Sequence, residues 1–257
     1  MTPVPLPASF LMRPIAHRAL HDRAAGRIEN SPSAIRAAVD AGYGIEIDLQ
    51  LSSDGVPMVF HDETLDRVTA HVGPVNARSA AELGRIALTG STDTIPTLAE
   101  VLKLVEGRVP LLVEIKDQSL SMGPTDGRLE AATAQVLDGY KGDVALMSFN
   151  PASVSHLARL APQLPRGITT SAYDPDDWAP LPADLCAHFR AIPDYGATGC
   201  SFISHEATDL GRDRVTQLKT HGAKVLCWTI RSAADEALAR KIADNVTFEG
   251  YRAALPA

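Results

Sequence analysis

The 257-residue sequence contains few cysteines and few aromatic residues, and it lacks both a long apolar run and a basic run. Cys186, Cys200 and Cys227 form no CxxC pair and have no histidine at the spacing of a zinc site, so we expect buried thiols. No apolar run approaches the roughly 20 residues that a membrane-spanning helix needs. The N-terminus also lacks a basic leader followed by a long apolar core. We therefore expect a cytoplasmic protein without stable membrane insertion.

The charge balance is acidic, with 24 Lys+Arg against 31 Asp+Glu and a net charge of -7. No stretch could neutralise a row of phosphates, which argues against nucleic-acid binding. With 45% hydrophobic and 21% charged residues, the composition is that of a folded globular protein. No helix face marks a dimer interface, so the sequence leaves the oligomeric state open.

Short apolar runs alternate with segments of helical periodicity, a pattern typical of βα units around a parallel sheet. The pattern predicts eight strands, at residues 14–17, 44–49, 111–115, 144–148, 167–170, 199–203, 224–230 and 245–248. Helices are expected at residues 33–41, 97–105, 128–137, 151–160, 182–192, 208–221 and 233–243. This count fits an α/β fold with a single (β/α)8 TIM barrel, in which residues 1–257 form one domain. A doubly wound open sheet is the alternative, but no GxGxxG follows the first strand.

One irregular stretch, residues 62–96, follows the strand pair 44–49 and 57–60. It is too long for an ordinary βα loop. We expect a small insertion after the second strand, at the rim of the active site.

Charged residues interrupt two of the predicted strands. A period of two sends Glu46 and Asp48 to one face of their strand, and it sends Glu114 and Lys116 to one face of the next. Three converging carboxylates raise one another's pKa unless a cation lies among them. One divalent ion with oxygen ligands, Mg²⁺ or Ca²⁺, meets this need. The alternative is a buried salt-bridge cluster in which Lys116 and Arg18 neutralise the acids without a metal.

Two histidines follow predicted strands. His17 ends the first strand and His61 follows residues 58–60, so both are expected at the carboxyl edge of the barrel as proton carriers. Arg18 offers a planar donor fork for a phosphate, and Lys116 offers a second positive charge. The other six histidines are expected to be solvated, with His205 nearest the rim. This set indicates phosphate-ester cleavage, and the sequence has no GxSxG elbow, Walker loop or kinase signature.

Seven short motifs in order resemble those of the glycerophosphodiester phosphodiesterase family, across most of the chain. His17-Arg18-Ala19 is similar to the family's His-Arg-Gly, Ile28-Glu29-Asn30-Ser31 to its Pro-Glu-Asn-Thr, and Glu46-Ile47-Asp48 is its Glu-x-Asp. His61-Asp62 with Leu65-Asp66-Arg67 resembles its His-Asp and Leu-x-Arg, and Glu114-Ile115-Lys116, Ser148-Phe149 and Trp228-Thr229 complete the series.

The resemblance implies a barrel that hydrolyses glycerophosphodiesters to glycerol 3-phosphate and an alcohol. It implies a divalent ion held by Glu46, Asp48 and Glu114. His17 and His61 would then be the general acid and base, Arg18 and Lys116 would hold the phosphate, and Trp228 would lie over the substrate at the mouth. A buried Trp228 that only packs in the barrel is the alternative.

The sequence departs from the family pattern at three places. Ala19 replaces a glycine and would be strained if that turn needs a positive φ, and Ile28 replaces a proline. Residues 247–251 stand where the family often has Thr-Asp-x-Pro, so the far rim of the pocket is expected to differ.

We considered three alternative functions for the same set of residues. A lysophospholipase D-like enzyme should expose an apolar or aromatic rim, but residues 70–94 contain no Trp, Phe or Tyr. A metal-dependent lyase or aldolase would not explain two histidines beside a phosphate clamp. A non-catalytic phosphodiester-binding module is the third alternative, and it should be stabilised by ligand without turnover.

Overall fold

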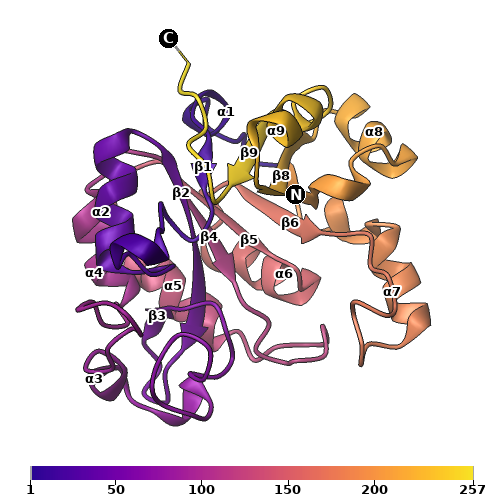
Figure 1. Ribbon diagram of the computed structural model, residues 1–257. Coiled ribbons are helices and arrows are strands. Elements are labelled where there is room, and N and C mark those ends of the chain that lie inside the picture. The colour runs from indigo at the N-terminus through magenta and orange to yellow at the C-terminus, as the bar shows by residue number, and fades with distance from the viewer. Residues whose placement is uncertain (1, 257) are drawn as a thin grey trace.

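The computed structural model describes residues 2–256, and its central feature is a closed barrel of parallel strands surrounded by helices (Figure 1). The strands are β1 Ile15–Ala16, β2 Gly44–Leu51, β3 Pro57–Val59, β4 Leu111–Ile115, β5 Val144–Ser148, β6 Arg166–Thr170, β7 Phe202–Glu206, β8 Lys224–Ile230 and β9 Asn245–Phe248. β1 closes the barrel by pairing in parallel with both β2 and β9, whereas β3 pairs antiparallel with β2. The predicted (β/α)8 barrel is confirmed.

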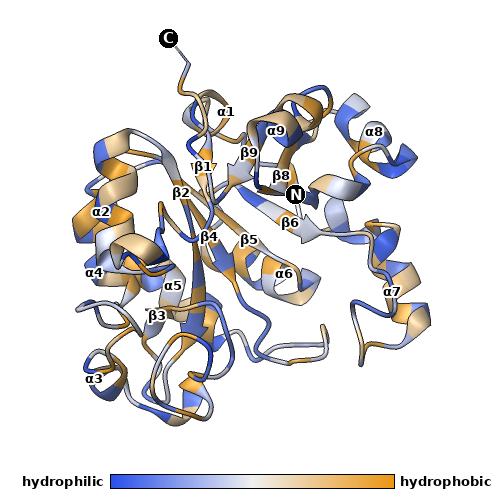
Figure 2. Ribbon diagram, viewed as in Figure 1, coloured by the Kyte–Doolittle hydropathy of each residue, from blue (hydrophilic) through white to orange (hydrophobic). Residues whose placement is uncertain are grey.

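Helices follow most of the strands and cover the outside of the barrel. They are α1 Ser9–Met12, α2 Pro32–Ala41, α3 Ala80–Leu83, α4 Leu98–Val105, α5 Arg128–Leu137, α6 Pro151–Leu160, α7 Ala183–Arg190, α8 Asp213–Thr220 and α9 Ala233–Ala239. Two begin as the sequence predicts, because Ser31 and Asn150 accept backbone N–H bonds just before a proline in the first turn. Figure 2 shows orange and blue residues on the same helices, as expected for helices with one buried face.

Apolar side chains fill the amino-terminal part of the barrel interior. Leu112, Phe202 and Leu226 belong to one buried cluster, which Phe10 of α1 joins. The next inward positions along β4, β7 and β8 are Glu114, Ser204 and Trp228. The packed layer therefore leaves a polar interior at the carboxyl ends of the strands, where barrel enzymes hold their active sites.

Residues 62–96 contain few regular elements, among them the 3₁₀ turn Val75–Ala77 and α3. The segment packs around apolar side chains of its own, including Leu65, Leu83 and Ile95, together with Met58 of β3. In Figure 1 it lies beyond the arrowheads of β2 and β4, at the lower side of the view. This position is next to the carboxyl ends of those strands.

The predicted strand at residues 199–203 is displaced, because β7 runs from Phe202 to Glu206. Gly199 has a φ of 65° and lies in a turn that ends with the Cys200 N–H donating to the Tyr195 carbonyl. The predicted helix 208–221 is also shorter, since a 3₁₀ turn at Ala207–Asp209 precedes α8. Both errors follow from local turns that hydrophobic periodicity does not detect.

The expectation that His205 is solvated is wrong. In the corrected strand His205 is fully buried, and its Nδ1 lies 2.8 Å from Thr170 Oγ1 and its Nε2 3.3 Å from Asp209 Oδ2. Alternation along β7 directs Ser204 into the barrel, so His205 faces the helix layer. Its side chain therefore does not point into the barrel interior.

The expectation for the cysteines is confirmed, because all three are buried and free. Burial raises the pKa of Cys200 and of Cys227 to about 12. Among residues 2–256, no helix is long and apolar enough to cross a membrane.

Candidate active site

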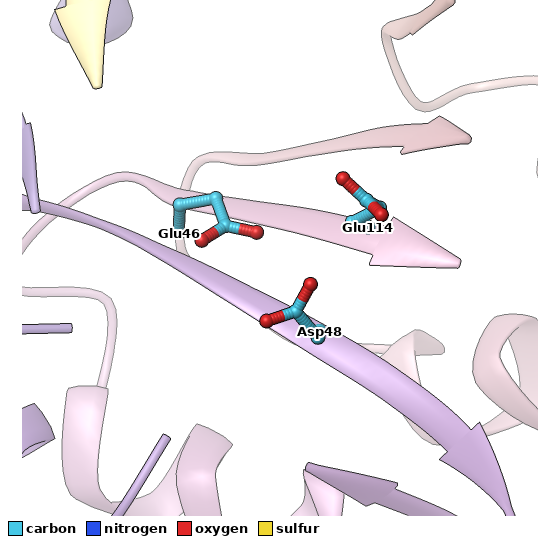
Figure 3. Close-up of side chains that lie close together, drawn as sticks. All are labelled: Glu46, Asp48 and Glu114. Atoms are coloured by element: carbon cyan, nitrogen blue, oxygen red, sulfur yellow. The ribbon is translucent and has the colours of Figure 1, made fainter. Parts of the chain in front are cut away.

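Three buried carboxylates converge at the carboxyl end of the barrel (Figure 3). Glu46 and Asp48 come from β2 and Glu114 comes from β4, in register with Asp48. They are 2%, 1% and 5% exposed, and one oxygen of each lies within 4.8 Å of one oxygen of the others. The alternation along the strands therefore produces the predicted acidic cluster.

Two cations neutralise this cluster only in part. Lys116 Nζ lies 2.7 Å from Asp48 Oδ1 and 2.5 Å from Glu114 Oε1, and Arg18 Nε lies 3.7 Å from Asp48 Oδ2. Glu46 accepts the backbone N–H of Arg18 at 2.8 Å but forms no ion pair within residues 2–256.

The charge distribution is visible in the pKa values of the two acids of β2. Burial raises the pKa of Glu46 well above its usual value, and the neighbouring Asp48 and Glu114 raise it further. Burial would also raise the pKa of Asp48, but Lys116 and Arg18 lower it far below its usual range. A salt-bridge cluster alone therefore leaves Glu46 without a cation, and this donor set fits a hard divalent ion.

His17 is held by a carboxylate from the opposite end of the chain. Its Nδ1 lies 2.6 Å from Glu249 Oε2, and Arg231 Nε donates to Glu249 Oε1 at 2.9 Å. Because a carboxylate can only accept, Nδ1 carries the proton and Nε2 remains as an acceptor. Burial lowers the pKa of His17 although Glu249 raises it, which favours the neutral ring. His17 is therefore prepared to accept a proton.

His61 belongs to a continuous chain of ion pairs. Its Nδ1 lies 2.6 Å from Asp62 Oδ1, and Arg67 Nε donates to Asp62 Oδ2 at 2.6 Å. Arg67 also donates to Glu29 Oε1 and Oε2 at 2.5 and 2.8 Å, and Glu29 accepts a bond of 2.9 Å from Arg18. This chain fixes the His61 ring relative to the Arg18 guanidinium.

A cavity of about 170 Å³ joins these groups. All eight predicted site residues line it, namely His17, Arg18, Glu46, Asp48, His61, Glu114, Lys116 and Trp228. The Trp228 indole packs edge-on against Phe149, with centroids 5.5 Å apart, and its Nε1 donates to the Ser204 carbonyl at 3.0 Å. Trp228 therefore packs against its neighbours in the barrel and also lines the cavity, so the two alternatives expected for this residue do not exclude each other.

Sequence reasoning gave no role to several residues that hold the site. Glu249 lies in residues 247–251, where the chain departs from the family pattern, and that departure was the only signal. His21, expected to be solvated, has its Nε2 3.7 Å from Glu249 Oε2. Ala19 has a φ of 65°, so the strain expected of a side chain at that turn is present. Asn30 donates to Asp48 Oδ2 at 2.9 Å and thereby orients a cluster carboxylate.

Comparison with known proteins gives consistent results. The model of the glycerophosphoryl diester phosphodiesterase family matches residues 17–246. The Bacillus subtilis protein YhdW, which carries the same activity in its provisional name, is 27% identical over 229 residues, which are 85% of this chain and 86% of YhdW.

Two solved structures extend the comparison. An Oleispira antarctica phosphodiesterase, solved in complex with the product sn-glycerol-3-phosphate, has a TM-score of 0.72 and 26% identity, covering 94% of each chain. A glycerophosphodiester phosphodiesterase from Thermotoga maritima, 19% identical with a TM-score of 0.68 over 91% of this chain and 92% of its own, shares the fold. The chain therefore belongs to the glycerophosphoryl diester phosphodiesterase family and is a phosphoric diester hydrolase.

Proposed function

We propose that this chain hydrolyses glycerophosphodiesters to glycerol 3-phosphate and an alcohol, with one Mg²⁺ or Ca²⁺ held by Glu46, Asp48 and Glu114. The observation that carries the proposal is the single cavity lined by three acids, two histidines and two cations. When bound, the divalent ion would polarise the phosphate as a Lewis acid. We also propose that residues 1–257 act as one catalytic domain in the cytoplasm.

The histidines have separate roles in this proposal. His17 accepts at Nε2 the proton of the nucleophile, because its Nδ1 is occupied by Glu249. The oxygen of the nucleophile bonds to phosphorus as the bond between phosphorus and the leaving oxygen breaks, and His61, whose Nδ1 lies 2.6 Å from Asp62, donates a proton to the leaving oxygen. Arg18 and Lys116 bind the phosphate oxygens, and Trp228 forms one wall.

The nucleophile is either water or the 2-hydroxyl of the substrate. A quenched reaction distinguishes them, because attack by the hydroxyl passes through a cyclic glycerol phosphate. Detection of this intermediate would identify the hydroxyl, whereas its absence at every time point would identify water.

Release of glycerol 3-phosphate by metal-stripped protein, with Mg²⁺, Ca²⁺ or EDTA, tests the function. With glycerophosphocholine as substrate we expect metal-dependent release that falls by at least about 100-fold in Glu46→Ala and in His17→Ala. Asp184→Ala, an exposed acid on α7, is the control and should retain activity. Release by Glu46→Ala at the wild-type rate would contradict the proposal.

Lysophospholipid cleavage is the second candidate, because apolar side chains do occur at the rim outside residues 70–94. Leu120 is 61% exposed, and with Met122, Trp178 and Leu181 it lines a larger cavity beside the acids. A lysophospholipid should then be cleaved faster than glycerophosphocholine. Thermal stabilisation by either ester without product release would instead favour the non-catalytic binding module.

A further inference from the structure

The larger cavity, of about 520 Å³, adjoins the candidate active site, and the hydrolysis of glycerophosphodiesters proposed above assigns no part of the substrate to it. It shares His61, Glu114, Lys116 and Phe149 with the smaller cavity. Its other walls come from Gln50 of β2, from Ile115 of β4 and from the segments that follow β3, β4 and β6, in residues 62–64, 117–122 and 177–181. A phosphate between Arg18 and Lys116 would therefore have one ester substituent directed toward this space.

The cavity carries an excess of negative charge. Its lining includes the carboxylates of Asp62, Glu63, Glu114, Asp117 and Asp177, against one lysine ammonium. Lys116 pairs with Glu114, and Arg67 pairs with Asp62.

Three of these carboxylates lack a cationic partner. In the ion pairs formed within residues 2–256, Glu63, Asp117 and Asp177 do not take part. Partial burial would raise the pKa of Asp117, but hydrogen bonds from Asn150 and Ser119 lower it, so this group is an anion at neutral pH. The cavity therefore presents uncompensated carboxylates to whatever enters it.

Aromatic rings form another wall of the same cavity. Phe149 and Trp178 have centroids 5.2 Å apart with an interplanar angle of 57°. Tyr173 packs against Trp178 at 4.6 Å and supports the indole from outside the cavity. Aromatic faces near carboxylates attract organic cations, whereas an anion is repelled and an acyl chain would leave the charges unpaired.

We propose that this cavity binds the alcohol portion of the substrate and selects a head group carrying an ammonium, such as choline. The inference rests on the proposed function, since it assigns the alcohol substituent of the phosphodiester in that reaction to this cavity. The aromatic wall would contact the methyl groups of the cation, and Asp117, Asp177 and Glu63 would supply the opposite charge.

The test compares two diesters of the same shape. One is glycerophosphocholine, and the other replaces choline by 3,3-dimethylbutan-1-ol, which has a carbon in place of the charged nitrogen. With wild-type protein and Mg²⁺ we expect kcat/KM to be at least about fivefold higher for the choline diester. The ratio should decrease as salt is added, because the exposed carboxylates are screened.

Substitutions in the cavity test whether its residues produce the preference for the choline diester. Asp177→Asn and Trp178→Leu should each lower the ratio of the two kcat/KM values by about two- to fivefold. Asp184→Asn, an acid on α7 that does not line the cavity, is the matched control and should keep the ratio. Because both substrates are measured on the same protein, a loss of folded enzyme cancels from the ratio.

The outcomes separate this inference from the proposed function. Hydrolysis of both diesters at equal rates, or an unchanged ratio in both cavity variants, would overturn the inference and leave the proposed function intact. If neither diester is hydrolysed, the proposed function fails, and calorimetric titration with choline and with 3,3-dimethylbutan-1-ol decides the inference. Tighter binding of choline would support the cation site, and equal or absent binding would overturn it.

Discussion

At the scale of single residues, the site depends on partners that lie far away in the sequence. Glu249 is separated from His17 by 232 positions, yet its carboxylate selects the tautomer of the ring and leaves Nε2 free. The same carboxylate takes Arg231 on its other oxygen, so its position is fixed from two sides. The pKa of Glu249 is well below its usual range because His17 forms a hydrogen bond to it and His21 lies 3.7 Å away, which keeps it anionic.

Glu249→Gln should change the pH dependence of catalysis. Glu249 raises the pKa of His17, so its removal lowers that pKa further. Because His17 must be neutral to accept a proton, the acidic limb of kcat/KM should move to lower pH. An amide can also donate to Nδ1 and stabilise the wrong tautomer, so kcat should fall about 10- to 100-fold with KM little changed.

The pH profile of kcat/KM against glycerophosphocholine measures this effect. Asp184→Asn removes a charge elsewhere and should keep the wild-type profile. An acidic limb at the wild-type position in Glu249→Gln, with kcat preserved, would show that His17 does not depend on this carboxylate.

The alternation within strands made the acidic cluster predictable from the sequence. The residues that hold the catalytic side chains in place, such as Glu249, could not be predicted in this way. Glu46 and Asp48 are two positions apart on one strand, so a period of two suffices to place them together. Glu249 meets His17 only because β1 and β9 are neighbours in the closed barrel. No spacing in the sequence encodes that contact, and only the resemblance drew attention to its segment.

At the scale of elements, the strand positions follow the apolar runs except where a turn intervenes. Residues 199–201 are apolar or small and resemble the start of a strand, but Gly199 turns the chain and β7 begins at Phe202. The displacement places His205 inside the strand instead of in the loop after it, which explains why this side chain is buried.

Gly167→Ala should destabilise the barrel through the contact between β6 and β7. Gly167 is paired with Phe202, and an added Cβ would lie 2.4 Å from the ring of that residue. Phe202 is fully buried in the interior layer and has no free space to move into. We expect the free energy of unfolding to fall by about 1–3 kcal/mol.

Urea denaturation measures this loss, and Gly196→Ala is the matched control. Gly196 has a φ of -72° and no atom within 4 Å of an added Cβ, so that change should have little effect. Equal stability of Gly167→Ala and the wild type would mean that the interior layer can rearrange around the new methyl group.

At the scale of the whole molecule, the barrel interior is divided between stability and function. Its amino-terminal layer is apolar and closed by α1, whereas its carboxyl end buries three carboxylates against two cations. Burying uncompensated charge costs folding free energy. A divalent ion that binds only the folded state raises the free energy of unfolding by mass action and offsets this cost.

Glu46→Gln should therefore stabilise the metal-free protein and abolish its stabilisation by metal. In the folded state the pKa of Glu46 is raised, so the folded chain keeps a proton that the unfolded chain releases above its usual pKa of 4.5. The contribution of Glu46 to stability thus falls as pH rises above that value. The substitution removes this loss, and the difference in Tm between the variant and the metal-free wild type should grow with pH.

Thermal unfolding with EDTA or with Mg²⁺ tests both statements. A concentration of 100 times Kd should stabilise the wild type by about 2.7 kcal/mol, whereas Glu46→Gln should gain much less. The Asp184→Asn control should respond to Mg²⁺ as the wild type does. If Glu46→Gln responded equally, Glu46 would not be a ligand, and if its metal-free form melted below the wild type across the pH range, the buried carboxylate would not be a folding cost. The two results are independent, because the response to Mg²⁺ measures binding of the ion, whereas the Tm in EDTA measures the stability of the metal-free protein alone.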